Sequence, residues 1–274
     1  MSESVRYAIL DTDFVSKANI IKSNNRVLAD EVLEFPRYRF YCHQKMKAEL
    51  GDHGTRSAQA WLEQKIASGD IRCYDDEQII KELREAAGNH CYAYYQSYLV
   101  EGCNMIRSDF YEEYFAKLDE YLLRESCDDA GFLDALRDCE SLIGHQKSYG
   151  EVKAFVLLKA IRFVYSVEAF IFCSDDFDAR RSYANSAAIP CISILSVFLK
   201  LWLLKRPIEE VQPYYQSFID WRTDRENPQV NVRVWRFSKG SNKREKVPIE
   251  NILMDIYAGK YEARKDGDLQ LKTE

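Results

Sequence analysis

Acidic residues occur in four separate stretches of the chain, either directly after an expected strand or within an expected helix. They are Asp11 after "RYAIL", Glu49 in "QKMKAEL", Glu151 in "GEVKAFVLLKA", and Asp175 and Asp176 in "FCSDDFDAR". Carboxylates that share one site without a counter-charge repel one another, so such a site needs a cation. Mg²⁺ and Mn²⁺ favour oxygen ligands of this kind. One or two of these ions lower the pKa of an attacking water and offset charge at phosphorus, which is chemistry that cleaves phosphodiesters.

The elements that must position these acids alternate between strand and helix. Apolar runs predict five strands, at 6–10, 38–42, 71–74, 168–174 and 188–194. Helical spacing lies between them, and this alternation predicts a three-layer α/β/α fold around a mostly parallel, five-stranded sheet. Functional crevices in such sheets lie outside the carboxyl ends of the strands. If the first and fourth strands are neighbours, the acids that follow them, Asp13 included, meet at one edge, and Glu49 and Glu151 point toward it.

Two segments depart from this alternation. Residues from about 77 to 145 have helical patterns rich in Glu, Lys, Leu and Tyr, which predicts a helical insertion within a domain at 1–206. Pro207 begins a C-terminal extension, 207–274, of mixed helix and strand. Its pattern predicts a helix interrupted by Pro213, then a strand and another amphipathic helix.

Composition narrows the class of protein. The 274 residues, 46% of them hydrophobic, are enough for one substantial core, and the net charge of −6 leaves only local basic tracts to guide an anionic substrate. The 8 cysteines are dispersed, form no CxxC pair and follow no signal peptide, which predicts reduced thiols in a cytoplasmic protein. The longest apolar stretch, 191–199, is far shorter than the roughly 20 residues that a membrane span needs, so we expect no membrane association.

One local basic tract is the segment "RVWRFSKGSNKREK" at 233–246, which interleaves aromatic and cationic residues. Stacking side chains beside cations suit single-stranded RNA or DNA. The alternative is a half-buried strand of a hairpin that its lysines keep soluble. The candidate nucleic-acid-binding residues are Arg233, Arg236, Lys239, Lys243 and Arg244.

The stretches "AILDTDFVSK", "YCHQKMKAEL", "GEVKAFVLLKA" and "FCSDDFDAR", in this order, resemble the motifs of the PIN-domain nucleases. The resemblance covers residues 5–195 apart from the insertion, and the C-terminal extension has no counterpart in it. It implies a PIN-like fold and a set of site residues, namely Asp11, Glu49, Glu151 and Asp176 as metal ligands, Asp175 as an alternative last ligand, and Ser174 as an orienting hydroxyl.

The activity that the resemblance implies is that of an endoribonuclease that uses Mg²⁺ or Mn²⁺ to hydrolyse phosphodiester bonds of single-stranded or loop RNA. Many small nucleases of this family act as toxins held by an antitoxin. Partners that the resemblance leaves open are therefore an inhibitory, antitoxin-like protein and a second copy of the chain. Substrate choice is expected to depend on the insertion and the extension.

Two other functions fit parts of the sequence. The stretch "DTDFV" also fits the nucleophile loop of haloacid-dehalogenase-like phosphatases, with Asp11 as nucleophile and Asp13 as acid and base. That alternative leaves Glu49 and Glu151 unexplained. A catalytically inactive PIN-like binding module, with the insertion docking a partner, is the other alternative, and it makes the carboxylates expendable.

Overall fold

The computed structural model describes residues 5–52, 55–122, 128–143, 148–223, 230–238 and 241–272. Its centre is a five-stranded sheet in the order β5-β4-β1-β6-β7, in which every neighbouring pair is parallel. The strands are β1 (Arg6–Leu10), β4 (Tyr38–His43), β5 (Ile71–Tyr74), β6 (Phe170–Cys173) and β7 (Cys191–Ile192). The predicted α/β fold with a parallel five-stranded sheet is confirmed.

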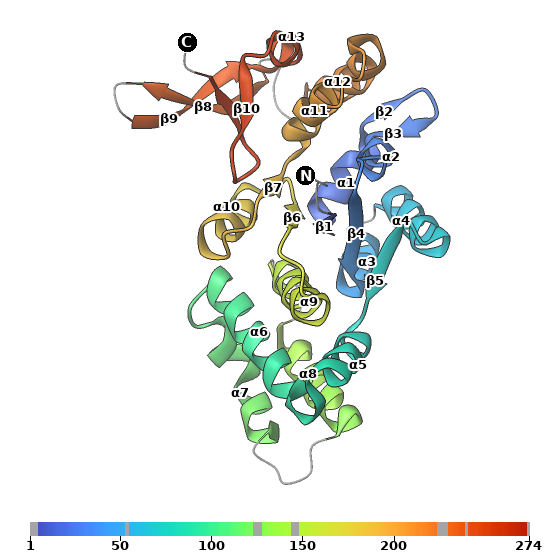
Figure 1. Cartoon of the computed structure of the whole chain (residues 1–274), viewed down its shortest axis with the longest axis vertical. Coiled ribbons are helices and arrows are strands. Elements are labelled where there is room, and N and C mark those ends of the chain that lie inside the picture. The colour runs from blue at the N-terminus through green and yellow to red at the C-terminus, as the bar shows by residue number, and fades with distance from the viewer. Residues whose placement is uncertain are drawn as a thin grey trace.

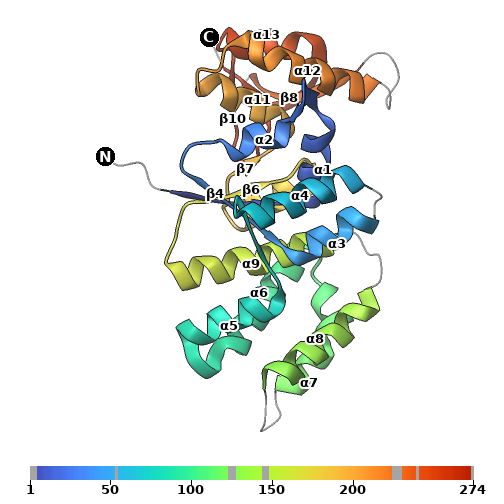
Figure 2. The same ribbon diagram turned by 90° about the vertical axis from the view of Figure 1, so that its right-hand side faces the viewer.

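Alternation along each strand divides the core between the two faces of the sheet. In β1, Ala8 and Leu10 belong to one hydrophobic cluster, whereas Ile9 between them belongs to the other. The first cluster takes residues from α1 (Thr12–Ile20), α2 (Leu28–Leu33), α3 (Gln44–Asp52), α4 (Arg56–Ser68) and α11 (Ile194–Leu203). In Figure 2 the strands lie between α2 and α11 on one side and α9 (Tyr149–Tyr165) on the other. These are the three layers that the sequence predicts.

The helical insertion packs on the second face, at the opposite end of the molecule from the C-terminal extension (Figure 1). It consists of α5 (Asp76–Ala87), a 3₁₀ turn at Gly88–His90, α6 (Cys91–Ile106), α7 (Phe110–Leu122) and α8 (Asp129–Ile143). No strand occurs among the described residues of 77–145. The insertion leads into α9, and α10 (Phe177–Ser186) follows β6 on the same face.

A buried ammonium group joins the insertion to the rest of the fold. Lys153 in α9 is 1% exposed, and its Nζ lies 2.8 Å from both carboxylate oxygens of Asp76, 2.8 Å from Tyr95 Oη and 2.5 Å from Glu140 Oε1. His43, at the end of β4, donates from Nε2 to Asp76 at 3.2 Å, because its Nδ1 accepts from the Lys45 backbone. Burial raises the pKa of Asp76, but Lys153 and His43 outweigh burial and hold it well below its usual range. The group ties α5, α6 and α8 to α9 and to the central sheet.

The C-terminal extension contains α12 (Ile208–Thr223), α13 (Ile252–Tyr257) and a four-stranded sheet in the order β10-β11-β8-β9. Its strands are β8 (Asn231–Ser238), β9 (Ser241–Pro248), β10 (Tyr261–Ala263) and β11 (Leu269–Leu271), with a 3₁₀ turn at Ile249–Asn251. Buried residues of the extension join the first cluster of the core. Among the described residues, no helix has the length and apolar character that a bilayer-crossing segment needs.

Three features of the extension and its surroundings differ from the sequence-based expectations. The expected interruption at Pro213 is wrong, because α12 continues through it and buries Val211, Tyr214, Tyr215 and Phe218, which offsets the cost of roughly 3 kcal/mol of a helical proline. The pairs β2 (Lys22–Ser23) and β3 (Arg26–Val27), and β10 and β11, were not predicted. These strands have only two or three residues and, unlike the two-residue β7, do not lie within a longer apolar run.

The extension also covers the edge of the central sheet at β7. The Cys191 backbone N–H donates to the Lys265 carbonyl at 2.7 Å, and Ser193 Oγ donates to the Gly267 carbonyl at 2.6 Å. Gly267 has φ +76°, and a Cβ there would lie 3.0 Å from the Cys191 carbonyl oxygen, so only glycine fits this turn. The contact removes an exposed sheet edge next to the strands that carry the candidate site.

The Lys153 network predicts a large difference between two lysines of the same helix. Lys153→Met leaves the buried Asp76 carboxylate without its main counter-charge and should lower the free energy of unfolding by about 3 kcal/mol. Lys159→Met removes a more exposed pair with Glu101 and should cost less than about 1 kcal/mol. Urea unfolding of the two variants measures this difference. Equal losses would show that the network does not hold the insertion in place.

Candidate metal centre

The candidate acids at the ends of β1 and β6 leave the sheet side by side. β1 and β6 are neighbours in register, with Leu10 opposite Cys173, so the condition on which the predicted convergence depends is met. The backbone N–H of Asp11 donates to the Cys173 carbonyl at 3.0 Å. Ser174 Oγ donates to Asp11 Oδ2 at 2.8 Å and accepts from the Asp176 backbone N–H at 3.1 Å. Ser174 therefore orients the Asp11 carboxylate.

Glu49 and Glu151 reach the same edge from α3 and α9. Glu49 accepts a hydrogen bond of 2.6 Å from Thr12 Oγ1, at the start of α1. Its carboxylate lies against the backbone of Gly150, where a Cβ would be 2.6 Å from Oε2 and 2.7 Å from Oε1. Glu151 is in the first turn of α9, and its carbonyl accepts from Tyr183 Oη at 2.8 Å. A glycine directly before Glu151 is thus what allows the two glutamates to approach.

These carboxylates lie close enough to act on one another's charge. Burial raises the pKa of Asp11 well above its usual value, Glu151, Asp13 and Glu49 raise it further, and the Ser174 hydrogen bond opposes them. Burial likewise raises the pKa of Glu151 to about 7, with Glu49, Asp176 and Asp13 adding to the shift. These shifts disfavour the charged forms of Asp11 and Glu151, and among the described residues no Lys, Arg or His forms an ion pair with either.

The two neighbouring acids after β6 have different surroundings. Asp175 Oδ2 lies 2.9 Å from Lys17 Nζ, and its Oδ1 accepts from the Ile194 backbone N–H at 3.1 Å. The same Lys17 ammonium binds Asp13 at 2.7 Å. Asp176 caps α10 through Oδ1, which accepts from Ala179 N–H at 2.8 Å, and its Oδ2 has no hydrogen bond among the described residues. This geometry favours Asp176 over Asp175 as the candidate last ligand.

The donor set fits a hard divalent ion. Asp11, Glu49, Glu151, Asp176 and the Ser174 hydroxyl offer oxygen atoms alone, as Mg²⁺ and Mn²⁺ prefer. Within the described part of the chain, no three His, Cys, Asp or Glu side chains are placed tightly enough to enclose a metal ion as they stand. A closed cage is not required, since Mg²⁺ keeps several waters and takes one or two carboxylates. The burial of Asp11 and the contact of the Glu49 carboxylate with Gly150, next to Glu151, support the fit, because a cation among these carboxylates would favour the charged forms that their raised pKa values disfavour.

The predicted nucleic-acid-binding residues are divided between the two faces of the β8–β9 hairpin. Arg233 and Trp235, which pairs with Arg244, lie on one face, whereas Arg236 and its partner Lys243 lie on the other. Arg233 and Arg244 line a cavity that also contains Asp175, whereas Arg236 and Lys243 are not among its lining residues. Lys239 lies outside the described residues. The structure therefore brings Arg233 and Arg244 toward the carboxylates, but not Arg236 or Lys243.

Two basic residues beside the site were missed in the sequence. Lys17 binds Asp13 and Asp175, and its spacing of four residues from Asp13 on a predicted helix is a signal that could have indicated the first pair. Arg180 is 4% exposed and donates to the Ser174 carbonyl at 3.3 Å and to Asp268 at 2.7 Å. No local pattern indicates that second partner, which is 88 residues away along the chain.

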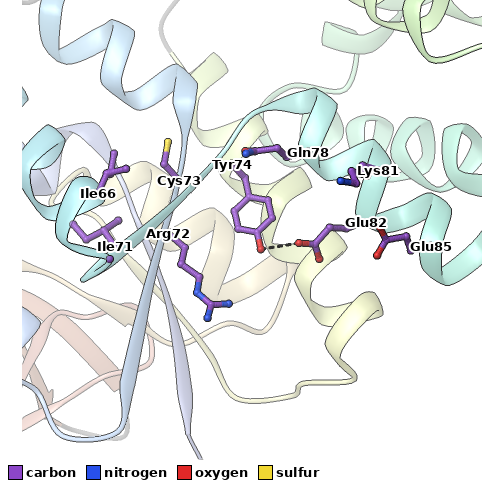
Figure 3. Close-up of a pocket in the computed structure, with 10 residues that line it drawn as sticks. Ile66, Ile71, Arg72, Cys73, Tyr74, Gln78, Lys81, Glu82 and Glu85 are labelled. Atoms are coloured by element: carbon purple, nitrogen blue, oxygen red, sulfur yellow. Dashed lines mark hydrogen bonds between the residues drawn. The ribbon is translucent and has the colours of Figure 1, made fainter.

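A second cavity, of about 580 Å³, opens beside the edge strand β5 and contains none of the candidate carboxylates. Figure 3 shows that Tyr74 and Glu82 face one another across it, and Tyr74 Oη donates to Glu82 at 2.9 Å. Arg72, Gln78 and Lys81 also line this cavity. The charged residues that line this cavity are both basic and acidic, and the candidate metal-binding carboxylates lie elsewhere among the described residues. We therefore look for the candidate metal centre at the carboxylate edge.

Comparison of the chain with family models, with curated proteins and with solved structures finds no match. A functional assignment must therefore come from the residues at the carboxylate edge and their surroundings.

The raised pKa of Glu151 predicts a pH dependence of stability in the presence of EDTA. Between the ordinary value of 4.5 and about 7, the folded chain binds more protons than the unfolded chain, so the free energy of unfolding falls as pH rises through this window. The loss should approach about 3 kcal/mol, and Glu151→Gln should remove most of it. The exposed Glu168→Gln should leave the profile unchanged. A flat wild-type profile in urea unfolding would contradict the prediction.

The contact between Glu49 and Gly150 predicts that Gly150→Ala weakens binding of Mn²⁺. The new Cβ must displace the Glu49 carboxylate, and the affinity should fall about tenfold or more, as when an oriented ligand loses its support. Gly51→Ala is the matched control, since its Cβ would meet only the flexible Gln59 side chain, at 3.4 Å. Calorimetric titration with Mn²⁺ measures both. Equal affinities of the two variants would exclude Glu49 from the centre.

Proposed function

We propose that this chain is a divalent-metal-dependent nuclease of the PIN-domain type, an endoribonuclease that hydrolyses phosphodiester bonds of single-stranded or loop RNA. One observation carries the proposal. Carboxylates from four separate elements share the carboxyl edge of a parallel sheet, and Asp11 and Glu151 have raised pKa values and no ion-pair partner among the described residues. The resemblance of the four acidic motifs to those of the PIN-domain nucleases supports the choice of family. The carboxyl edge of the sheet is also where such folds bind substrates.

In this proposal Asp11, Glu151 and Asp176 hold Mg²⁺ or Mn²⁺, and Glu49 holds it directly or through a water. When bound, the ion supplies a Lewis acid that stabilises negative charge at phosphorus and lowers the pKa of a water. Ser174 keeps the Asp11 carboxylate in one orientation, and Thr12 does the same for Glu49. Asp176 is the most exposed member of the set, so substrate is expected to approach from its side.

The two alternatives receive less support from the same residues. In the phosphatase, Asp13 must exchange a proton, yet its carboxylate is bound to Lys17 at 2.7 Å. That chemistry also gives no role to Glu49 and Glu151, which influence the pKa of Asp11. An inactive binding module would keep a destabilising cluster of like charges without using it. An antitoxin-like partner, a homo-oligomer and a cytoplasmic location stay predictions.

The test is cleavage of a mixed-sequence single-stranded RNA by the full chain with Mn²⁺ or Mg²⁺. Wild type should cleave it, and excess EDTA should abolish cleavage. Asp176→Asn should lower the rate by about a hundredfold or more, the scale on which loss of one charge-stabilising group acts. Asp178→Asn, an exposed acid in the first turn of the same helix α10, is the matched control and should retain activity.

Each outcome of this assay distinguishes the functions. Cleavage that survives EDTA or Asp176→Asn would contradict the proposed metal centre. A folded wild type that binds Mn²⁺, leaves RNA intact and releases phosphate from a phosphomonoester would establish the phosphatase. Failure of all these reactions, with Mn²⁺ bound, would leave the binding module.

A further inference from the structure

A cavity of about 450 Å³ lies directly beside the carboxylate edge, between the start of α10 and the β8–β9 hairpin. We call it the hairpin groove. The residues that matter for its chemistry are Asp175, Phe177, Arg233, Arg244, Lys246 and Asp268. Asp175 and Phe177 flank Asp176 in the chain, so the groove and the candidate metal centre share a wall. Figure 1 shows the two elements that form it, α10 and the hairpin, on the same side of the molecule.

Two of the cations around the groove are already committed to protein partners. Arg180 binds Asp268 at 2.7 Å. Arg244 binds the other oxygen of Asp268 at 3.0 Å, and its guanidinium lies 3.5 Å from the centre of the Phe177 ring. These contacts fasten the extension to the wall of the candidate centre. They also make Arg180 and Arg244 structural, and neither is available to bind a ligand without loss of these contacts.

Arg233 and Lys246 differ from those two cations. They are opposite one another across the hairpin, both side chains are exposed, and neither has an ion-pair partner among the described residues. Their two charges therefore face the hairpin groove without being neutralised. In a chain with a net charge of −6, such a pair beside an acidic centre is an unusual concentration of positive charge.

A polyanion that approaches the carboxylate edge is repelled by its negative charge, so nearby cations are needed to offset the repulsion. Screening limits electrostatic guidance to about 8 Å at physiological salt, so only cations close to the centre can offset its repulsion of phosphates. We infer, on the basis of the proposed nuclease function, that the hairpin groove binds the sugar–phosphate backbone of the single-stranded RNA, and that Arg233 and Lys246 contact its phosphates. The extension, which has no counterpart in the PIN-domain resemblance, supplies both cations.

The aromatic residues in and beside the groove favour a contact that does not depend on base sequence. The Phe177 ring, which lines the groove, has the Arg244 guanidinium over one face. Beside the groove, the Trp235 ring has the Arg264 guanidinium 4.2 Å from its centre, and its Nε1 donates a hydrogen bond of 3.0 Å to Asp268. Because cations already contact these rings, we expect the strand to be held through its phosphates rather than by base stacking. Phosphate contacts alone position a strand without selecting its sequence.

The hairpin itself provides a matched control. Arg233→Ala with Lys246→Ala removes two positive charges from the groove face, and Arg236→Ala with Lys243→Ala removes two from the opposite face of the same strands. Both pairs are exposed, so both double variants should fold, which thermal melting checks. The full chain carrying Asp11→Asn, which prevents the proposed cleavage, is the background for measuring binding of a fluorescent single-stranded RNA.

The groove variant should bind this RNA about tenfold more weakly, and the slope of its affinity against salt should fall by about 1.4, for two phosphate contacts on a single strand. The opposite-face variant should match its background, and two RNAs of different sequence should give the same results. The inference is overturned if the two double variants weaken binding equally, or if neither does.

Cleavage by the corresponding variants with Asp11 intact separates this inference from the proposed function. If wild type cleaves RNA and the groove variant cleaves and binds like its control, the groove inference fails and the nuclease stands. If wild type does not cleave, but only the groove variant loses RNA binding, the groove is a binding site and the nuclease proposal fails.

Discussion

Repulsion among like charges at one edge of the sheet is the constraint on which the rest of this structure depends. Asp11 is buried and Glu151 is half-buried, and water therefore screens their charges poorly. Among the described residues, Ser174 donates to Asp11 and Thr12 to Glu49, but neither hydrogen bond joins one carboxylate to another. The pairing of β1 with β6 and the packing of α3 and α9 must therefore hold the carboxylates together. The arrangement of the candidate centre is therefore set by the surrounding fold and not by attraction among the carboxylates.

Several of the chain's cations near this edge are paired with acids outside the inner cluster. Lys153 is matched by Asp76 and Glu140 on the side of the insertion, and Arg180 is matched by Asp268 on the side of the extension. Lys17 balances only the two outer acids, Asp13 and Asp175. The inner carboxylates, Asp11, Glu49, Glu151 and Asp176, are left without an ion-pair partner among the described residues. Both additions to the fold thus stabilise the surroundings of the centre while leaving its negative charge available.

The sequence was sufficient to predict elements with a long hydrophobic pattern and candidate acids that lie at the end of a strand. The five central strands lie within clear apolar runs and the intervening helices have clear periods, and Asp11 and Asp176 follow from where two of these strands stop. Strands of two or three residues, such as β10, have no period to detect. The contact of Arg180 with Asp268 joins residues 88 apart, which no local pattern encodes. Alternation along a strand places Arg233 and Arg236 on opposite faces, but which of these faces docks beside the candidate centre depends on tertiary packing that no local pattern encodes.

The docking of the extension has a consequence for the order in which the protein is made. A nascent chain that has grown to residue 206 already contains every inner carboxylate, but Arg180, which donates to the carbonyl of Ser174, still lacks its partners at 266 and 268. The edge of β7 is open at that stage too, because Lys265 is absent. The wall of the candidate centre is finished only after the residues from 207 to 268 have emerged and folded back. Synthesis from the N-terminus thus delays the completed centre while the chain is still beside the messenger and ribosomal RNA.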